Sequence, residues 1–123
     1  MYETLIMLKP GTLFTPDQME QIVRGIAASQ NRALQRDGTS TTLTVADSYL
    51  EIDFNDAPHV AEESREIASD CNIPCADCTS RFEMNGDDPD MELFNDYLLI
   101  NEKLNATGQF IIFDQAEGEL FGT

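Results

Sequence analysis

The chain is poor in basic residues, has no tryptophan and contains no long apolar run. Only seven Lys and Arg residues stand against 23 Asp and Glu residues, so the formal net charge of the 123-residue chain is −16. Each neutralised phosphate requires a cationic side chain, so this balance disfavours nucleic acid and anionic lipid as direct ligands. Apolar runs such as Leu5 to Leu8 and Phe110 to Phe113 have four residues, whereas a membrane-spanning helix needs ~20. The sequence therefore predicts no membrane span and favours a basic protein as any macromolecular partner.

The sequence also lacks the features of a secreted, disulfide-stapled domain. No basic region precedes an apolar stretch at the N-terminus, and the only cysteines, Cys71, Cys75 and Cys78, form an odd set within eight residues. Reduced thiols in a cytosol are the simplest interpretation, so we expect a cytoplasmic protein. The length and the 41% apolar content suit one compact core, and we expect residues 1–123 to form a single α+β domain.

What the chain does contain is acid, concentrated after residue 36. The first 36 residues carry four basic and three acidic side chains, whereas residues 37–123 carry three basic and 20 acidic ones. Net charge bears on partners and solubility rather than on the fold. A nearly neutral segment followed by a strongly anionic one predicts an acidic patch rather than acid spread evenly over the surface.

Three local patterns predict the secondary structure of the first half. Leu5 to Leu8 is apolar at every position and stops at Pro10-Gly11, as expected for a central strand. Thr15, followed by Pro16 and Gln18, is the signature of a helix start with a capping box. Apolar residues then recur at helical spacing, at Met19, Ile22, Val23, Ile26 and Ala27, and the helix is expected to end between residues 29 and 37. Between residues 41 and 54 the period changes to two, which predicts a hairpin turning near Asp47-Ser48.

The second half continues with two more helices. One is expected to open at Pro58, with Asp56 as its cap, and to be broken by Ile73-Pro74. A short strand from Arg81 to Met84, closed by Asn85-Gly86, precedes a third helix that Asp88 or Asp90 would cap and Gly108 would end. Residues 110–113 form a last strand. The first six elements match the split strand-helix-strand pattern, so we expect a ferredoxin-like β-α-β-β-α-β sandwich with an extra C-terminal helix and strand.

The cysteine cluster carries the sharpest motif. Its C-x3-C-x2-C spacing resembles the cluster-binding signature of the radical S-adenosylmethionine enzymes over eight residues. Those enzymes usually have an aromatic residue before the last cysteine, where this chain has Asp77, and the chain is too short for their barrel. A zinc site made of Cys71, Cys75 and Cys78 with His59 or Asp77 is the better variant, and a Cys75–Cys78 redox pair is a further one. The alternative without a metal or redox role is that Cys71 packs as a small hydrophobic residue. No cofactor other than zinc is expected.

Acidic residues gather in three places that could meet a partner. They are the outer positions of the hairpin, the second helix and the approach to the third helix: Glu51, Asp53, Glu62, Glu63, Glu66, Asp87, Asp88 and Asp90. The stretch from Asn85 to Glu92 does not follow the glycine and glutamate positions of an EF-hand loop. A solvated strand or helix surface is the default explanation for each group.

Three explanations compete for the acidic excess: a basic partner, a high-salt host, and solubility. The last two would spread acid over the whole surface, whereas the first helix region holds Arg24, Arg32 and Arg36. With one histidine and no nucleophile motif, the chain gives no support for catalysis. We therefore expect a non-enzymatic partner-binding protein, of an immunity, inhibitor or nucleic-acid-mimic type. The alternative is a small metal or redox protein using the three cysteines, and the fold analogy leaves a homodimer possible.

Overall fold

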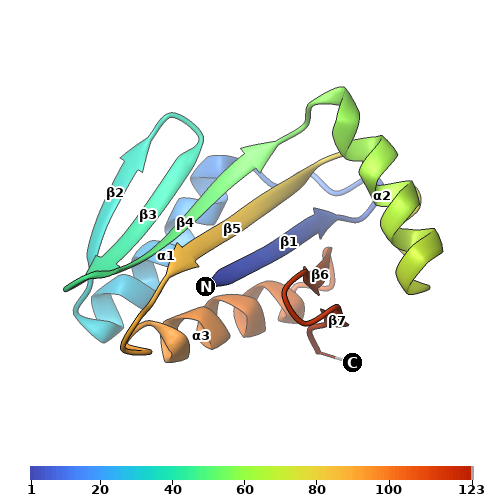
Figure 1. The fold of residues 1–123 in the computed structure, drawn as a ribbon. Helices are drawn as coiled ribbons and strands as arrows, with labels where there is room; N and C mark the ends of the chain where they lie inside the picture. The colour runs from blue at the N-terminus through green and yellow to red at the C-terminus, as the bar shows by residue number, and fades with distance from the viewer. Residues whose placement is uncertain (123) are drawn as a thin grey trace.

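The computed structural model describes residues 1–122, which contain one seven-stranded sheet and three helices (Figure 1). All neighbouring strands are antiparallel, and their order across the sheet is β2-β3-β4-β5-β1-β6-β7. The strands are β1 (Tyr2–Leu8), β2 (Ala33–Asp37), β3 (Ser40–Val45), β4 (Ser48–Asn55), β5 (Arg81–Asp87), β6 (Phe110–Asp114) and β7 (Glu119–Leu120). The first strand lies between β5 and β6, so its prediction as a central strand is confirmed.

The helices divide between the two faces of the sheet. Helices α1 (Pro16–Gln30) and α3 (Phe94–Ala106) pack together on one face, over a core that includes Ile6, Phe82 and Ile100. Helix α2 (Pro58–Cys71) lies apart from them, near one end of the sheet (Figure 1). It belongs to a second, smaller core on the opposite face, around Leu5 and Met7 of β1. None of the described helices is long and apolar enough to cross a membrane.

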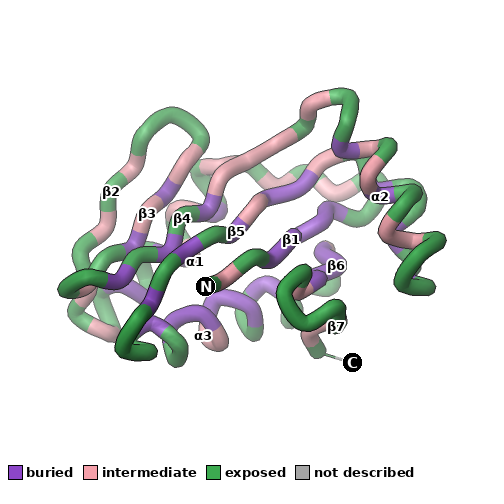
Figure 2. Tube along the Cα trace, in the orientation of Figure 1, coloured by how far each residue is buried: buried purple, intermediate pink, exposed green. Residues whose placement is uncertain are grey.

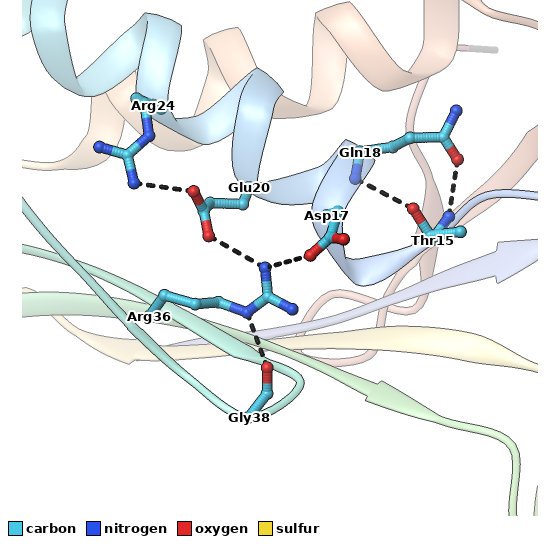
Figure 3. Close-up of polar contacts among 7 residues, drawn as sticks. All are labelled: Thr15, Asp17, Gln18, Glu20, Arg24, Arg36 and Gly38. Atoms are coloured by element: carbon cyan, nitrogen blue, oxygen red, sulfur yellow. Dashed lines mark hydrogen bonds and ion pairs between the residues drawn. The ribbon is translucent and has the colours of Figure 1, made fainter.

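The first helix forms as its sequence predicts. The Thr15 hydroxyl accepts a hydrogen bond from the Gln18 amide at 3.2 Å, and the Gln18 side chain accepts one from the Thr15 amide at 2.8 Å (Figure 3). Two of the amide groups that a helix start leaves unpaired are thereby satisfied. The buried face is Met19, Val23, Ile26 and Ala27, as the spacing indicated. The helix ends at Gln30 because Asn31 adopts a left-handed conformation, with φ 59°.

The mixed α+β class is confirmed, but the sheet order is not that of a simple ferredoxin-like fold. A split strand-helix-strand unit joins two parallel strands on either side of a third strand. The connection through α3 has this form, because it joins β5 and β6, which lie on either side of β1 and are parallel to each other. Helix α2 instead connects β4 to β5, which are adjacent and antiparallel, with Asn55 opposite Arg81. The chain leaves and re-enters the sheet at the same end, so α2 adds a partial layer on the other face.

Several local boundaries also differ from the sequence expectation. Residues 33–37 form β2, a strand that the sequence patterns did not predict, and the hairpin turns at Ala46-Asp47, one residue before the predicted position. Neither Asp56 nor Asp90 caps a helix, since α2 and α3 begin after Ala57 and Leu93 with no side-chain cap. Asn85-Gly86 does not close β5, because the strand is hydrogen-bonded to β1 and β4 on both sides through this dipeptide. These are places where tertiary pairing overrides a local turn signal.

Candidate protein-binding face

The face of the sheet opposite α1 and α3 is only partly covered by α2. Alternation along each strand and the register between strands place one set of side chains on this surface, which we call the open face. Its residues are partly or fully exposed apart from the buried Arg81. Buried and exposed positions alternate along β4 (Figure 2). They are Glu3, Ala33, Gln35, Asp37, Ser40, Thr42, Thr44, Tyr49, Glu51, Asp53, Asn55, Arg81, Glu83, Asn85 and Asp87.

Carboxylates on the open face lie in register with one another. Asp37 is opposite Ser40, which is opposite Asp53, which is opposite Glu83, so one row across four strands holds three carboxylates. Neighbouring strands are ~4.8 Å apart, and like charges directly opposite each other are destabilising. A second row aligns Glu51 with Asn85 and Glu3. Asp53 and Glu83 are directly opposite each other and both have partners, since Thr39 and Ser40 donate to Asp53 and Arg81 pairs with Glu83.

One cation, Arg81, belongs to the open face, and it is already paired. Its guanidinium contacts the Glu83 carboxylate at 2.7 Å and the Glu63 carboxylate of α2 at 2.8 Å. The Arg81 side chain is only 5% exposed, so it ties α2 to the sheet rather than presenting positive charge to a partner. Glu51, Asp37 and Asp87 have no ion pair among the described residues.

The charges of the first segment are arranged differently. Arg36 contacts Asp17 and Glu20 at 2.9 Å each, and Arg24 contacts Glu20 at 2.7 Å (Figure 3). Hydrogen bonds from Arg24 and then Arg36 lower the pKa of Glu20. Arg32 pairs with the buried Asp96 of α3. The three arginines of the first segment are thus all paired with carboxylates.

The structure brings together part of the predicted partner-binding set. Glu51, Asp53 and Asp87 lie on the open face, and Glu63 borders it through Arg81. Glu62 and Glu66 are exposed on α2, and Asp90 is exposed in the loop before α3. Three carboxylates of the open face were not in the predicted set: Glu3, Asp37 and Glu83. The alternation of Glu83 with Phe82 and Met84 was a signal that could have found it.

Asp88 does not belong to this surface. It is 7% exposed and accepts hydrogen bonds from the hydroxyls of Tyr2 at 2.7 Å and Ser48 at 2.6 Å, and from the Leu93 amide at 2.9 Å. Burial raises the pKa of Asp88. The hydrogen bonds that Asp88 accepts, first those from Ser48 and Tyr2, outweigh this effect, so its pKa lies below the ordinary value. Asp88 therefore joins β1, β4 and the start of α3 as an ionised internal acceptor.

The three cysteines are not gathered into one ligand set in the described part of the chain. Cys75 and Cys78 are buried in the smaller core, Cys71 is exposed at the end of α2, and all three are free thiols. His59 lies in the first turn of α2, 3.9 Å from the Glu63 carboxylate. Within residues 1–122, no group of three or more His, Cys, Asp or Glu side chains is arranged to hold a metal ion. The zinc alternative has no geometric support in the described part of the chain.

The environment of the buried thiols also offers little support for redox chemistry. Burial raises the pKa of Cys75 and raises that of Cys78 to about 11. The thiolate is the reactive form, so both groups are predominantly protonated at neutral pH. The Cys75 thiol donates to the Ser64 carbonyl at 3.3 Å. These two cysteines act as small hydrophobic residues that attach the loop after α2 to β1 and β6.

Comparison with known proteins adds no further constraint. The sequence matches no protein-family model, and no significant match is found among curated proteins or solved structures. The candidate site therefore stands on the geometry and charge of the open face.

Proposed function

We propose that this protein is a non-enzymatic binding domain that presents the open face to a basic protein. The observation that carries the proposal is the group of exposed carboxylates without an ion pair among the described residues, Asp37, Glu51 and Asp87, on a surface that α2 leaves uncovered. These three carboxylates make no ion pair within the described chain that would stabilise the fold. They do generate a negative field that steers a positively charged partner and sets its orientation.

The distribution of the other charges supports a partner over general solubility. The exposed face of α1 carries Gln21, Arg24, Gly25, Ala28 and Ser29, with no unpaired carboxylate beyond its first turn. A high-salt host or a simple solubility requirement would favour acid there as well. An immunity protein, an inhibitor or a nucleic-acid mimic would need the acid on one surface, in a cytoplasmic setting. Two copies facing each other through the open face would repel, so a homodimer would have to use another surface.

The test is binding to basic proteins encoded in the same genome, measured by calorimetry at 50 mM and at 300 mM salt. We expect binding that weakens steeply with salt, because exposed charges are screened within ~10 Å at 0.1 M. Glu51→Lys should weaken binding, whereas Glu102→Lys on α3, with the same change in net charge, should have a smaller effect. Equal losses in the two variants, or no binding at 50 mM salt, would refute the proposal.

A further inference from the structure

A cavity of about 310 Å³ opens at the end of the sheet where β1 begins and β5 ends. We call it the aromatic cavity, because Tyr2, Phe94 and Tyr97 form much of its wall. Two methionines, Met1 and Met91, also line it. Met1, Met91 and Phe94 are three of the five large apolar side chains exposed among residues 1–122, and all three lie around this one cavity. Gathering exposed apolar side chains in one place is typical of an interaction site.

The three rings are stacked in nearly parallel planes. Tyr2 and Tyr97 have centroids 4.6 Å apart, Phe94 and Tyr97 have centroids 6.5 Å apart, and each pair has an interplanar angle of 23°. The Tyr97 hydroxyl is 2.7 Å from the buried Thr4 hydroxyl, and the Tyr2 hydroxyl donates to Asp88. These contacts fix two of the rings, while Phe94 remains 41% exposed. The cavity thus has a rigid aromatic wall with one accessible ring, a surface that attracts cations and planar groups.

The remaining wall is acidic. Asp114 and Glu117 line the cavity together with Asp88, and the described lining residues include no Lys, Arg or His. Asp114 holds the turn after β6 with Oδ1, which accepts from the amides of Ala116 and Glu117, and its Oδ2 makes no hydrogen bond within the described chain. Glu117 is exposed. Two carboxylates are therefore available beside the rings, whereas Asp88 already uses both of its oxygens internally.

We infer that the aromatic cavity is the anchor site for an arginine side chain of the basic partner. A guanidinium is planar, stacks on aromatic rings and donates two parallel hydrogen bonds to a carboxylate, whereas an ammonium group is a strongly hydrated point charge. Parallel rings beside Asp114 and Glu117 fit the first chemistry better. A buried arginine surrounded by aromatic residues is also a common centre of binding energy at protein interfaces.

The cavity and the open face meet at the same end of the sheet, on opposite sides of β1. Alternation along β1 places Glu3 on the open face and Tyr2 on the cavity side, and Asp87 on the open face immediately precedes Asp88. A partner that contacts both has to reach around this end of the sheet. The inference rests on the proposed function, since it identifies which partner residue enters at this edge.

The experiment uses N-acetyl-arginine amide as the probe, titrated into the full chain and followed by NMR chemical shifts. N-acetyl-lysine amide and the neutral N-acetyl-citrulline amide are the comparison probes. We expect the arginine probe to shift the signals of Tyr2, Phe94 and Tyr97 at millimolar concentration, with weaker effects of the other two. Phe94→Ala and Glu117→Gln should each weaken the arginine probe about threefold to fivefold. Both positions are exposed, so both variants should fold, and retained backbone spectra verify this.

Glu51→Gln on the open face is the matched control for Glu117→Gln. Equal weakening by the two changes, equal shifts with citrulline, or equal affinity for lysine would overturn the arginine site. The arginine site and the proposed function can be refuted separately. If a basic protein binds in a Glu51-dependent way but is unaffected by Phe94→Ala and Glu117→Gln, the proposed function stands and the arginine site is refuted. If the arginine probe binds as expected and no basic protein binds, the arginine site stands and the proposed function is refuted.

Discussion

Across strands β2 to β5, the two faces of the sheet share one backbone and have opposite side-chain chemistry. In β4, Leu50 is buried under α1 and α3, and the next residue, Glu51, is exposed on the open face. The covered face has an apolar core, and the charges of α1 beside it are paired; the open face carries several unpaired carboxylates. Stability is therefore concentrated on one side. Because the open face contributes little to folding, it is free to carry charge that the fold does not need.

The largest expected effect tests how tightly the covered face is packed. Gly86 of β5 lies on that side, where an added Cβ would collide with the Tyr49 backbone oxygen and with the Leu50 side chain. Gly86→Ala should cost more than about 3 kcal/mol of unfolding free energy, measured by urea denaturation. Gly25 of α1 has nothing within 4 Å of an added Cβ, so Gly25→Ala should stabilise by about 0.5–1 kcal/mol. Similar values for both variants would contradict this packing.

Leu50 and Glu51, which are neighbours in β4, test the difference between the two faces of the sheet most directly. Leu50→Ala should destabilise the fold by about 2–5 kcal/mol, because it removes a fully buried side chain and leaves a cavity. Glu51→Ala should change stability by less than about 0.5 kcal/mol, since Glu51 is exposed. Urea unfolding of the two variants gives both numbers. A large loss from Glu51→Ala would mean that the open face is covered or structural.

Asp88 provides a pH-dependent test of the junction between the faces. Its folded pKa lies below the ordinary value of 3.8, so its contribution is complete above that value and is lost as pH falls through the folded pKa. Asp88→Asn should cost about 2 kcal/mol at pH 7, because an amide cannot accept all three hydrogen bonds. The difference in stability between the parent and the variant should shrink below about pH 4. A constant difference from pH 7 to pH 3 would show that the charge of Asp88 has no role.

The smallest effect concerns the carboxylate row itself. Asp37 lies at the exposed end of the row and has no ion pair among the described residues. Asp37→Lys should stabilise the fold by up to about 0.5 kcal/mol in low salt by relieving repulsion, and the gain should vanish at 1 M salt. Thermal unfolding at two salt concentrations measures this. A loss of stability in low salt would mean that the row is not repulsive.

Local signals were reliable where neighbouring residues decide the structure. The capping box at Thr15, the stop at Gly108 and the buried stripe of α1 were predictable, because caps and periodicity are local. The inward positions of Phe82 and Met84 followed from alternation. Half of the candidate site was predictable in the same way, since Glu51 and Asp53 alternate with Leu50 and Ile52.

Other features depend on which segments meet in space. The strand order depends on α2 leaving and re-entering the sheet at one end, and no short stretch of sequence specifies that choice. Asp88 was predicted as a possible helix cap from its position before α3. In the structure, the Tyr2 and Ser48 hydroxyls, which come from distant strands, donate to it and make it a buried acceptor. The cysteine spacing suggested that the three thiols share one ligand set. In the structure, Cys75 and Cys78 are buried in the second core, whereas Cys71 is exposed.

The sequence by itself determined the class of the fold, the central position of β1 and an excess of acid after residue 36. Those properties follow from hydrophobic periodicity and composition, which act locally or as sums. Only the tertiary structure decided that Asp37, Asp53 and Glu83 lie in one row, and that Tyr2, Phe94 and Tyr97 line one cavity. Residues far apart in the chain become neighbours through strand register and helix packing, which depend on the whole molecule at once.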